Sequence, residues 1–166
     1  MTPKKRMVLV AALAAIAAAS AAYLLIGQNG QVARQAEIAA KGSQVMPFDL
    51  ERTTHRFTKS ATGGLQTVTA DDPADAQQVK LIREHLAKEA AGFSKDDFGD
   101  PATIHGSEMP GLRELEQGHG RIDIRYAQTP AGAQLTYTTA DRPLVAALHA
   151  WFDAQVSDHG QHAEHG

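Results

Sequence analysis

Two stretches of the sequence decide the fold: Leu65-Gln66-Thr67-Val68-Thr69-Ala70-Asp71-Asp72-Pro73 and Leu135-Thr136-Tyr137-Thr138-Thr139-Ala140-Asp141-Arg142-Pro143. Five of the nine positions are identical, at an offset of seventy residues. Each stretch follows an alternating run and a glycine-containing turn, at 55–64 and at 122–132. Alternation on both sides of such a turn is typical of a β-hairpin. Each stretch then leads through Asp-x-Pro into a helical pattern, so the sequence predicts the order ββα twice.

One ββα unit alone cannot form a stable core, and this determines the predicted architecture. A single hairpin with one helix buries too little apolar surface for a stable core, whereas two hairpins in one sheet covered by two helices bury enough. Apolar residues recur at helical spacing in both helix regions, at Val79, Ile82 and Leu86 and again at Leu148 and Phe152. We therefore expect an α+β domain with a four-stranded antiparallel sheet covered by two helices. The two units are either an internal repeat or two uses of the same turn chemistry.

The N-terminus predicts a membrane segment. Basic residues at 4–6 precede an uncharged, apolar run over 7–26, which is long enough to cross a bilayer. The basic residues favour a cytoplasmic N-terminus, so residues 1–27 are expected to form a single-pass inner-membrane anchor with the rest of the chain in the periplasm. The alternative is a signal peptide cleaved near Ala19–Ala22, after which the protein is secreted to the periplasm. The apolar residues 23–26 favour the retained anchor.

The rest of the chain is expected to form a linker over 28–46, a periplasmic α+β domain over 47–160 and a His-containing tail over 161–166. A weak helical pattern around Val32–Ala40, interrupted by glycines, indicates that the linker is either a flexible tether or partly helical. The chain has no cysteine, which excludes disulfides and thiolate metal sites. Beyond the basic residues 4–6, thirteen Lys and Arg stand against nineteen Asp and Glu. This acidic balance argues against a nucleic-acid partner.

Histidines carry the strongest functional signal. All eight lie at or after His55, and His159, His162 and His165 follow one another at intervals of three. Imidazole and carboxylate ligands such as Asp158 suit Zn²⁺ or Cu²⁺. Haem bound by one axial imidazole ranks below these ions, because the chain has no C-x-x-C-H motif. The alternative is that these residues form a solvated, frayed terminus.

A second, dispersed set of histidines consists of His55, His85, His105 and His149. Each has a structural explanation, such as a helix-flank position for His85 and a hydrogen bond between His149 and Asp153. His105 lies in a glycine- and proline-containing segment of the kind that often presents functional side chains. Convergence of several histidines, such as His105, His149 and His159, would instead indicate a site.

Several motifs between Thr54 and His162 resemble those of uncharacterised small bacterial envelope (periplasmic) proteins, some of which are named aspartate carbamoyltransferases. They include Gly63-Gly64-Leu65, Ile104-His105-Gly106 and Trp151-Phe152-Asp153. The resemblance implies an envelope location. The Ser-Thr-Arg-Thr phosphate loop of the transferase is absent from this sequence, so no catalytic residue is carried over.

No nucleophile elbow, P-loop or H-E-x-x-H motif is present, so the sequence does not indicate an enzyme. We predict a membrane-tethered periplasmic protein that binds a divalent transition metal. The alternative is a non-catalytic structural or partner-binding envelope module with incidental histidines. The candidate metal ligands are His159, His162, His105, His149 and Asp158.

Overall fold

The computed structural model describes residues 25–166. The membrane segment predicted over 7–26 therefore lies almost wholly outside the described residues. Within the part that is described, no helix is both long and apolar enough to cross a membrane. The chain divides into two compact units, one up to Ala36 and one from Glu37 to Gly166.

The predicted linker is mostly helical. Residues 25–45 form a continuous helix, of which 37–45 belong to the second unit. The abundant alanines, together with Glu and Lys, are good helix formers, and Glu37 pairs with Lys41 one turn later. These preferences outweigh the helix-weakening effect of Gly42. The compact unit thus begins before residue 47, the start of the domain predicted from the sequence.

The sheet is mixed and has five strands, in the order β3-β4-β2-β1-β5. Two antiparallel hairpins, β1 (Thr53–Ser60) with β2 (Gly63–Ala70) and β3 (Asp123–Thr129) with β4 (Gly132–Thr138), are joined through antiparallel β2 and β4. The fifth strand, β5 (Ala163–His165), pairs in parallel with β1. The predicted four-stranded antiparallel sheet is therefore wrong, although the α+β class is confirmed.

The additional strand comes from the segment predicted to be a tail. After the short 3-10 helix η3 (Gly160–His162), the backbone N–H of Gly166 donates to the carbonyl of Phe57, and Glu164 pairs with Arg56. A three-residue strand carries too little alternation to be detected from sequence. Residues 161–166 are thus part of the folded domain.

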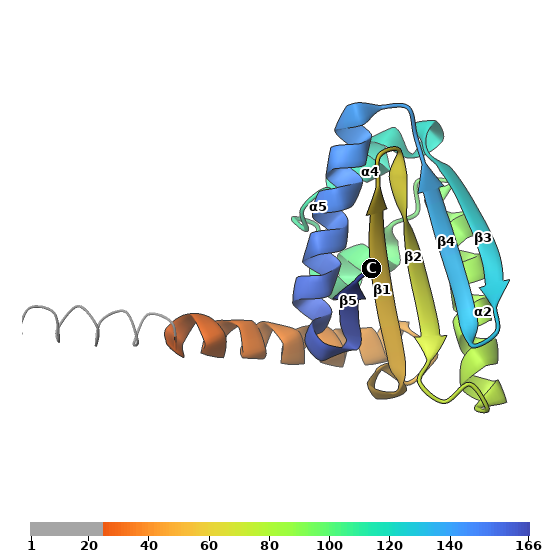
Figure 1. Ribbon diagram of the computed structural model, residues 1–166. Helices are drawn as coiled ribbons and strands as arrows, with labels where there is room; N and C mark the ends of the chain where they lie inside the picture. The colour runs from red at the N-terminus through yellow and green to blue at the C-terminus, as the bar shows by residue number, and fades with distance from the viewer. Residues whose placement is uncertain (1–24) are drawn as a thin grey trace, which may run out of the picture. The chain divides into compact units, whose positions relative to one another are not determined.

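Two long helices cover one face of the sheet (Figure 1). Helix α2 (Ala76–Phe93) contacts β2, β3 and β4, and helix α5 (Arg142–His159) contacts β1, β2 and β5. Gln78 of α2 bonds to Thr53, and Phe152 of α5 packs on Phe57, with ring centres 5.1 Å apart. Thr53 and Phe57 point to the same side of β1, so both helices share one core.

Helix α5 begins at the Asp-x-Pro motif as predicted, whereas helix α2 begins after its motif. Asp141 caps α5, with Pro143 in the first turn, as the Asp-x-Pro motif predicts. In the first unit Pro73 lies in a turn, and the cap is Asp75, whose side chain accepts from the backbone N–H of Gln78. The helix therefore begins three residues after Pro73.

The connection between α2 and β3 contains two further short helices, α3 (Gly99–His105) and α4 (Leu112–Gly118), followed by the 3-10 helix η2 (His119–Arg121). Helix α4 packs against α5. Gly111 precedes α4 with a φ of 80°, and a Cβ there would lie 2.0 Å from the carbonyl oxygen of Ala147. Helix α3 brings Asp100 and His105 to the core.

Candidate functional site

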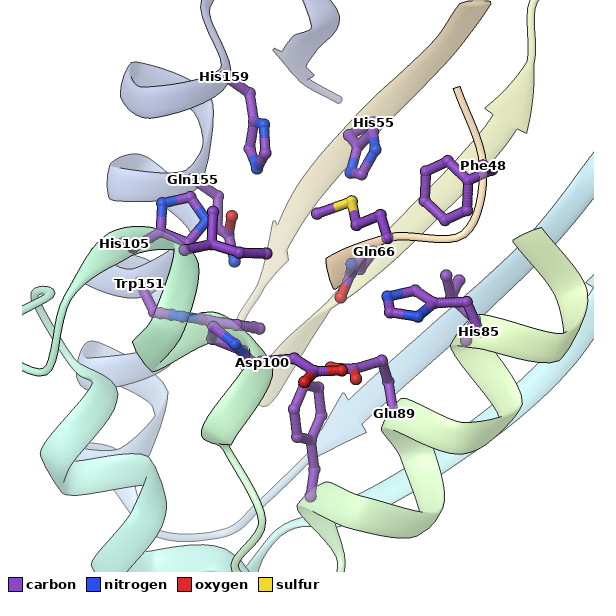
Figure 2. Close-up of a pocket in the computed structure, with 15 residues that line it drawn as sticks. Phe48, His55, Gln66, His85, Glu89, Asp100, His105, Trp151, Gln155 and His159 are labelled. Atoms are coloured by element: carbon purple, nitrogen blue, oxygen red, sulfur yellow. The ribbon is translucent and has the colours of Figure 1, made fainter. Parts of the chain in front are cut away.

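A cavity of about 40 Å³ lies between the sheet and helices α2, α3 and α5 (Figure 2). This space is sufficient for a few waters or an ion. Its lining combines four histidines and two carboxylates with aromatic and apolar side chains. The lining residues are Met46, Phe48, His55, Gln66, His85, Leu86, Glu89, Phe93, Asp100, Pro101, Ile104, His105, Trp151, Gln155 and His159.

Three potential metal ligands gather at one end of the cavity. His85 and Glu89 are four residues apart on α2 and therefore lie on the same face of that helix. Asp100 approaches them from α3 (Figure 2). One ligand atom from each residue lies within 4.8 Å of the other two. We call this group of one imidazole and two carboxyl groups the carboxylate triad.

The two carboxyl groups of the triad share a proton. Burial raises the pKa of Glu89 to about 8, and the hydrogen bond and negative charge of Asp100 add to this effect. Burial also disfavours the charged form of Asp100, but hydrogen bonds from Lys88 and Glu89 outweigh it and lower the pKa of Asp100. Near neutral pH, Glu89 is therefore mostly protonated and donates to an ionised Asp100. Lys88 holds Oδ2 of Asp100 at 2.9 Å.

Three imidazoles gather at the other end of the cavity. The ring centre of His159 lies 5.2 Å from that of His55 and 5.0 Å from that of His105. Nδ1 of His105 lies 2.8 Å from Oδ2 of Asp158. Because an ionised carboxylate only accepts hydrogen bonds, this pair places the His105 proton on Nδ1. We call His55, His105 and His159 the imidazole cluster.

Burial keeps two of these imidazoles, those of His55 and His159, in their neutral, metal-binding form. Desolvation, with smaller contributions from neighbouring histidines, lowers the pKa of His55 to about 3 and lowers that of His159 well below its usual value. Nε2 of His55 and Nε1 of Trp151 are both buried without a hydrogen-bond partner. Unpartnered buried polar atoms are rare, and both of these residues line the cavity. The residues that line the cavity therefore carry two polar atoms that could bind a polar occupant.

The structure brings together some of the predicted ligands and separates others. His105 and His159 meet in the imidazole cluster, with Asp158 behind His105. His149 instead donates from Nε2 to the carbonyls of Ser60 and Gly63, at 3.1 and 2.9 Å. His162 is not among the lining residues and lies 3.4 Å from Glu51. The expected partner of His149, Asp153, pairs with Lys59 instead.

The carboxylate triad was not predicted from the sequence, which placed His85 on a helix flank and did not single out Glu89 or Asp100. His85 is in fact only 9% exposed. The available signal was a His and a Glu four residues apart on one helix, a spacing that aligns two ligands on one face. Asp100 carried no such signal, because only the chain path after α2 brings α3 back over the cavity.

The carboxylate triad also borders the surface of the protein. Glu89 and Asp100 line a second hollow, of about 330 Å³, together with Lys88, Lys95 and Asp97. The same two carboxyl groups therefore stand between the inner cavity and the outside. A metal site requires an access route, and this hollow provides one.

Comparisons of the chain with protein-family models, with curated proteins and with solved structures found no match, so the resemblance to envelope proteins stays a prediction.

Proposed function

We propose that this protein binds a divalent transition-metal ion in its core cavity through His85, Glu89 and Asp100. The observation that carries the proposal is the approach of these three ligand atoms to within 4.8 Å of one another, from two helices, inside a cavity. A nitrogen and two oxygens form a ligand set that Zn²⁺ and other first-row ions accept.

The charge of the carboxylate triad supports a cation rather than an anion. An ion of charge +2 offsets two carboxylates, and the proton now shared by Glu89 and Asp100 occupies the position that a metal would take. His85 supplies a neutral nitrogen, because burial lowers its pKa. Three protein ligands leave a coordination position for water or another small ligand. The imidazole cluster borders that same cavity.

The predicted periplasmic location is compatible with a metal site of nitrogen and oxygen ligands. In the periplasm, a nitrogen and oxygen site would not compete with a reducing thiol pool for its ion. That location rests on the N-terminal sequence and stays a prediction. A partner-binding module with incidental histidines is the alternative, and the experiment below distinguishes the two.

The test measures Zn²⁺ binding by titration calorimetry. The full chain is purified in mild detergent with a tag that lacks histidine. We expect one ion to bind at the triad, with release of about one proton near neutral pH as Glu89 ionises, measured in buffers of different ionisation enthalpy. Bound Zn²⁺ should also raise the melting temperature, because it binds only the native state.

The matched variants are Glu89→Gln and Glu84→Gln, which change the same residue type on the same helix. Glu84 is exposed and pairs with Lys80, away from the cavity. Glu89→Gln should weaken Zn²⁺ binding by about tenfold or more and abolish the proton release, since the amide is a poor ligand and cannot ionise. Glu84→Gln should bind as the wild type does. Equal binding by both variants would exclude the carboxylate triad.

A further inference from the structure

The imidazole cluster is not used by the proposed metal site. Its three residues come from separate elements, His55 from β1, His105 from the end of α3 and His159 from the end of α5. All three are less than 10% exposed. Placing three polar rings in one core is unfavourable unless they serve an occupant or one another.

We propose that His55, His105 and His159 form a second metal site, which takes a copper or zinc ion through nitrogen ligands alone. Two imidazoles bound to one tetrahedral ion, with metal–nitrogen distances of about 2.0–2.1 Å, have ring centres roughly 5 Å apart. The separations of 5.0 and 5.2 Å around His159 are close to that value for two of the three ring pairs. This site shares the cavity with the carboxylate triad but none of its ligands.

Two further observations point to a ligand. Nε2 of His55 is a buried nitrogen without a hydrogen-bond partner, on a residue that is 3% exposed and lines the cavity. His105 is held through Nδ1 by Asp158, so Nε2 is the nitrogen that would bind an ion. A carboxylate behind a metal-binding imidazole fixes the ring orientation and increases its basicity. Asp158 is therefore a positioning residue.

The side chains of the imidazole cluster must rearrange to bind one ion. Among residues 25–166, the carboxylate triad is the group whose three ligand atoms lie within 4.8 Å of one another. His159 lies between the other two rings, so His55 and His105 must both turn towards it to share one ion (Figure 2). A site of nitrogens alone suits copper and zinc better than the harder ions that carboxylates accept.

The test uses Cu²⁺ alone and electron paramagnetic resonance of the full chain. Nitrogen coupling distinguishes the two sites, because the imidazole cluster supplies three nitrogens and the carboxylate triad only one. We expect a spectrum with coupling to several nitrogens, retained when Glu89→Gln and Asp100→Asn together remove the triad. Coupling to a single nitrogen, or loss of copper from that double variant, would overturn the second site.

Three variants then locate the nitrogens. His159→Gln should remove one nitrogen coupling, and Asp158→Asn should weaken copper binding by about tenfold with the number of coupled nitrogens unchanged. His149→Gln is the matched control, since His149 lies on the same helix and bonds only to carbonyls outside the cavity. Far-UV circular dichroism verifies that each variant is folded.

The outcomes separate the two proposals. If Glu89→Gln weakens Zn²⁺ binding but the copper spectrum shows coupling to one nitrogen, the carboxylate triad is supported as a metal site and the second site is excluded. If the copper spectrum shows coupling to several nitrogens and Glu89→Gln binds Zn²⁺ as the wild type does, the second site is supported and the carboxylate triad is excluded as a metal site. Replacing His162 and His165 with Gln should leave the copper spectrum unchanged, and a changed spectrum would assign the copper to the C-terminal histidines instead.

Discussion

Glu89 shows how a single residue connects stability to function. A carboxyl group whose pKa is raised to about 8 stays protonated in the folded protein at a pH where the unfolded chain has already lost the proton. Its contribution to folding is complete below pH 4.5, the ordinary value, and is lost as the pH rises through 8. The ionised form that a metal needs is therefore the form that destabilises the apo protein.

Glu89→Gln should consequently be more stable than the wild type at pH 8.5 and differ little from it at pH 4.5. The amide keeps the shape and hydrogen-bonding capacity of the protonated acid but has no charge to bury. We expect a difference of about 1–3 kcal/mol at the higher pH, reduced by the partial exposure of the side chain. Urea denaturation of metal-free protein at both pH values measures it. A variant less stable than the wild type at pH 8.5 would contradict the raised pKa.

Sequence patterns identified single residues of the site better than the site as a whole. His105, Asp158 and His159 were chosen for their types and do come together. His149 was chosen as one of the dispersed histidines, but its position in the sequence does not reveal that carbonyls of the β1–β2 turn lie within its reach. Residue type indicates possible chemistry, whereas proximity depends on how distant elements pack.

At the scale of elements, the α4 connection holds α5 in place and with it Trp151, Gln155 and His159. Gly111 allows that contact. Its φ of 80° disfavours any other residue, and a Cβ at this position would lie only 2.0 Å from the carbonyl oxygen of Ala147. The backbone before α4 and the backbone of α5 therefore touch directly at this point.

Gly111→Ala should destabilise the protein by about 2 kcal/mol or more, from a left-handed backbone conformation and a steric clash together. Gly120→Ala is the control, since Gly120 has no atom within 4 Å of its Cβ position. Thermal unfolding of the two variants provides the comparison. A similar melting temperature for both would mean that α4 shifts away from α5 at little cost.

The elements themselves were predictable where local chemistry decides them. Both hairpins and the cap of α5 at Asp141 follow from turn residues and short polar acceptors. The helix at 25–45 was expected only in part, because glycines interrupt its helical pattern. Strand β5 was not recognised, because it depends on pairing with a strand distant in sequence. Local rules do not describe such pairings.

At the scale of the whole molecule, the buried histidines make the free energy of unfolding depend on pH. The pKa of His55 is lowered to about 3, and those of His85 and His159 are also lowered, chiefly by burial. The unfolded chain binds protons at these residues near the ordinary value of 6.5, whereas the folded chain does not. Their stabilising contribution is therefore complete above pH 6.5 and is lost as the pH falls towards 3.

Replacing His55 with Leu should flatten the loss of stability in acid. One such histidine accounts for about 3 kcal/mol of unfolding free energy between pH 7 and pH 4, which the leucine variant would not lose. Denaturant unfolding of both proteins across this pH range measures how steeply the free energy of unfolding changes with pH. A difference in stability that comes from changed packing is the same at every pH and does not alter this slope. Parallel slopes would show that His55 titrates normally in the folded state.

The distance in sequence between the walls of the cavity also determines when the cavity becomes complete. Arg56 and its partner Glu164 are 108 residues apart, and the walls of the cavity come from segments nearly as distant. At about 5–20 residues per second, a ribosome needs roughly 5–20 s to synthesise the chain between them. No nascent chain can hold an ion in this cavity until α5 has emerged and packed. The compartment in which folding finishes, rather than the one in which synthesis begins, therefore decides which ions the protein encounters first.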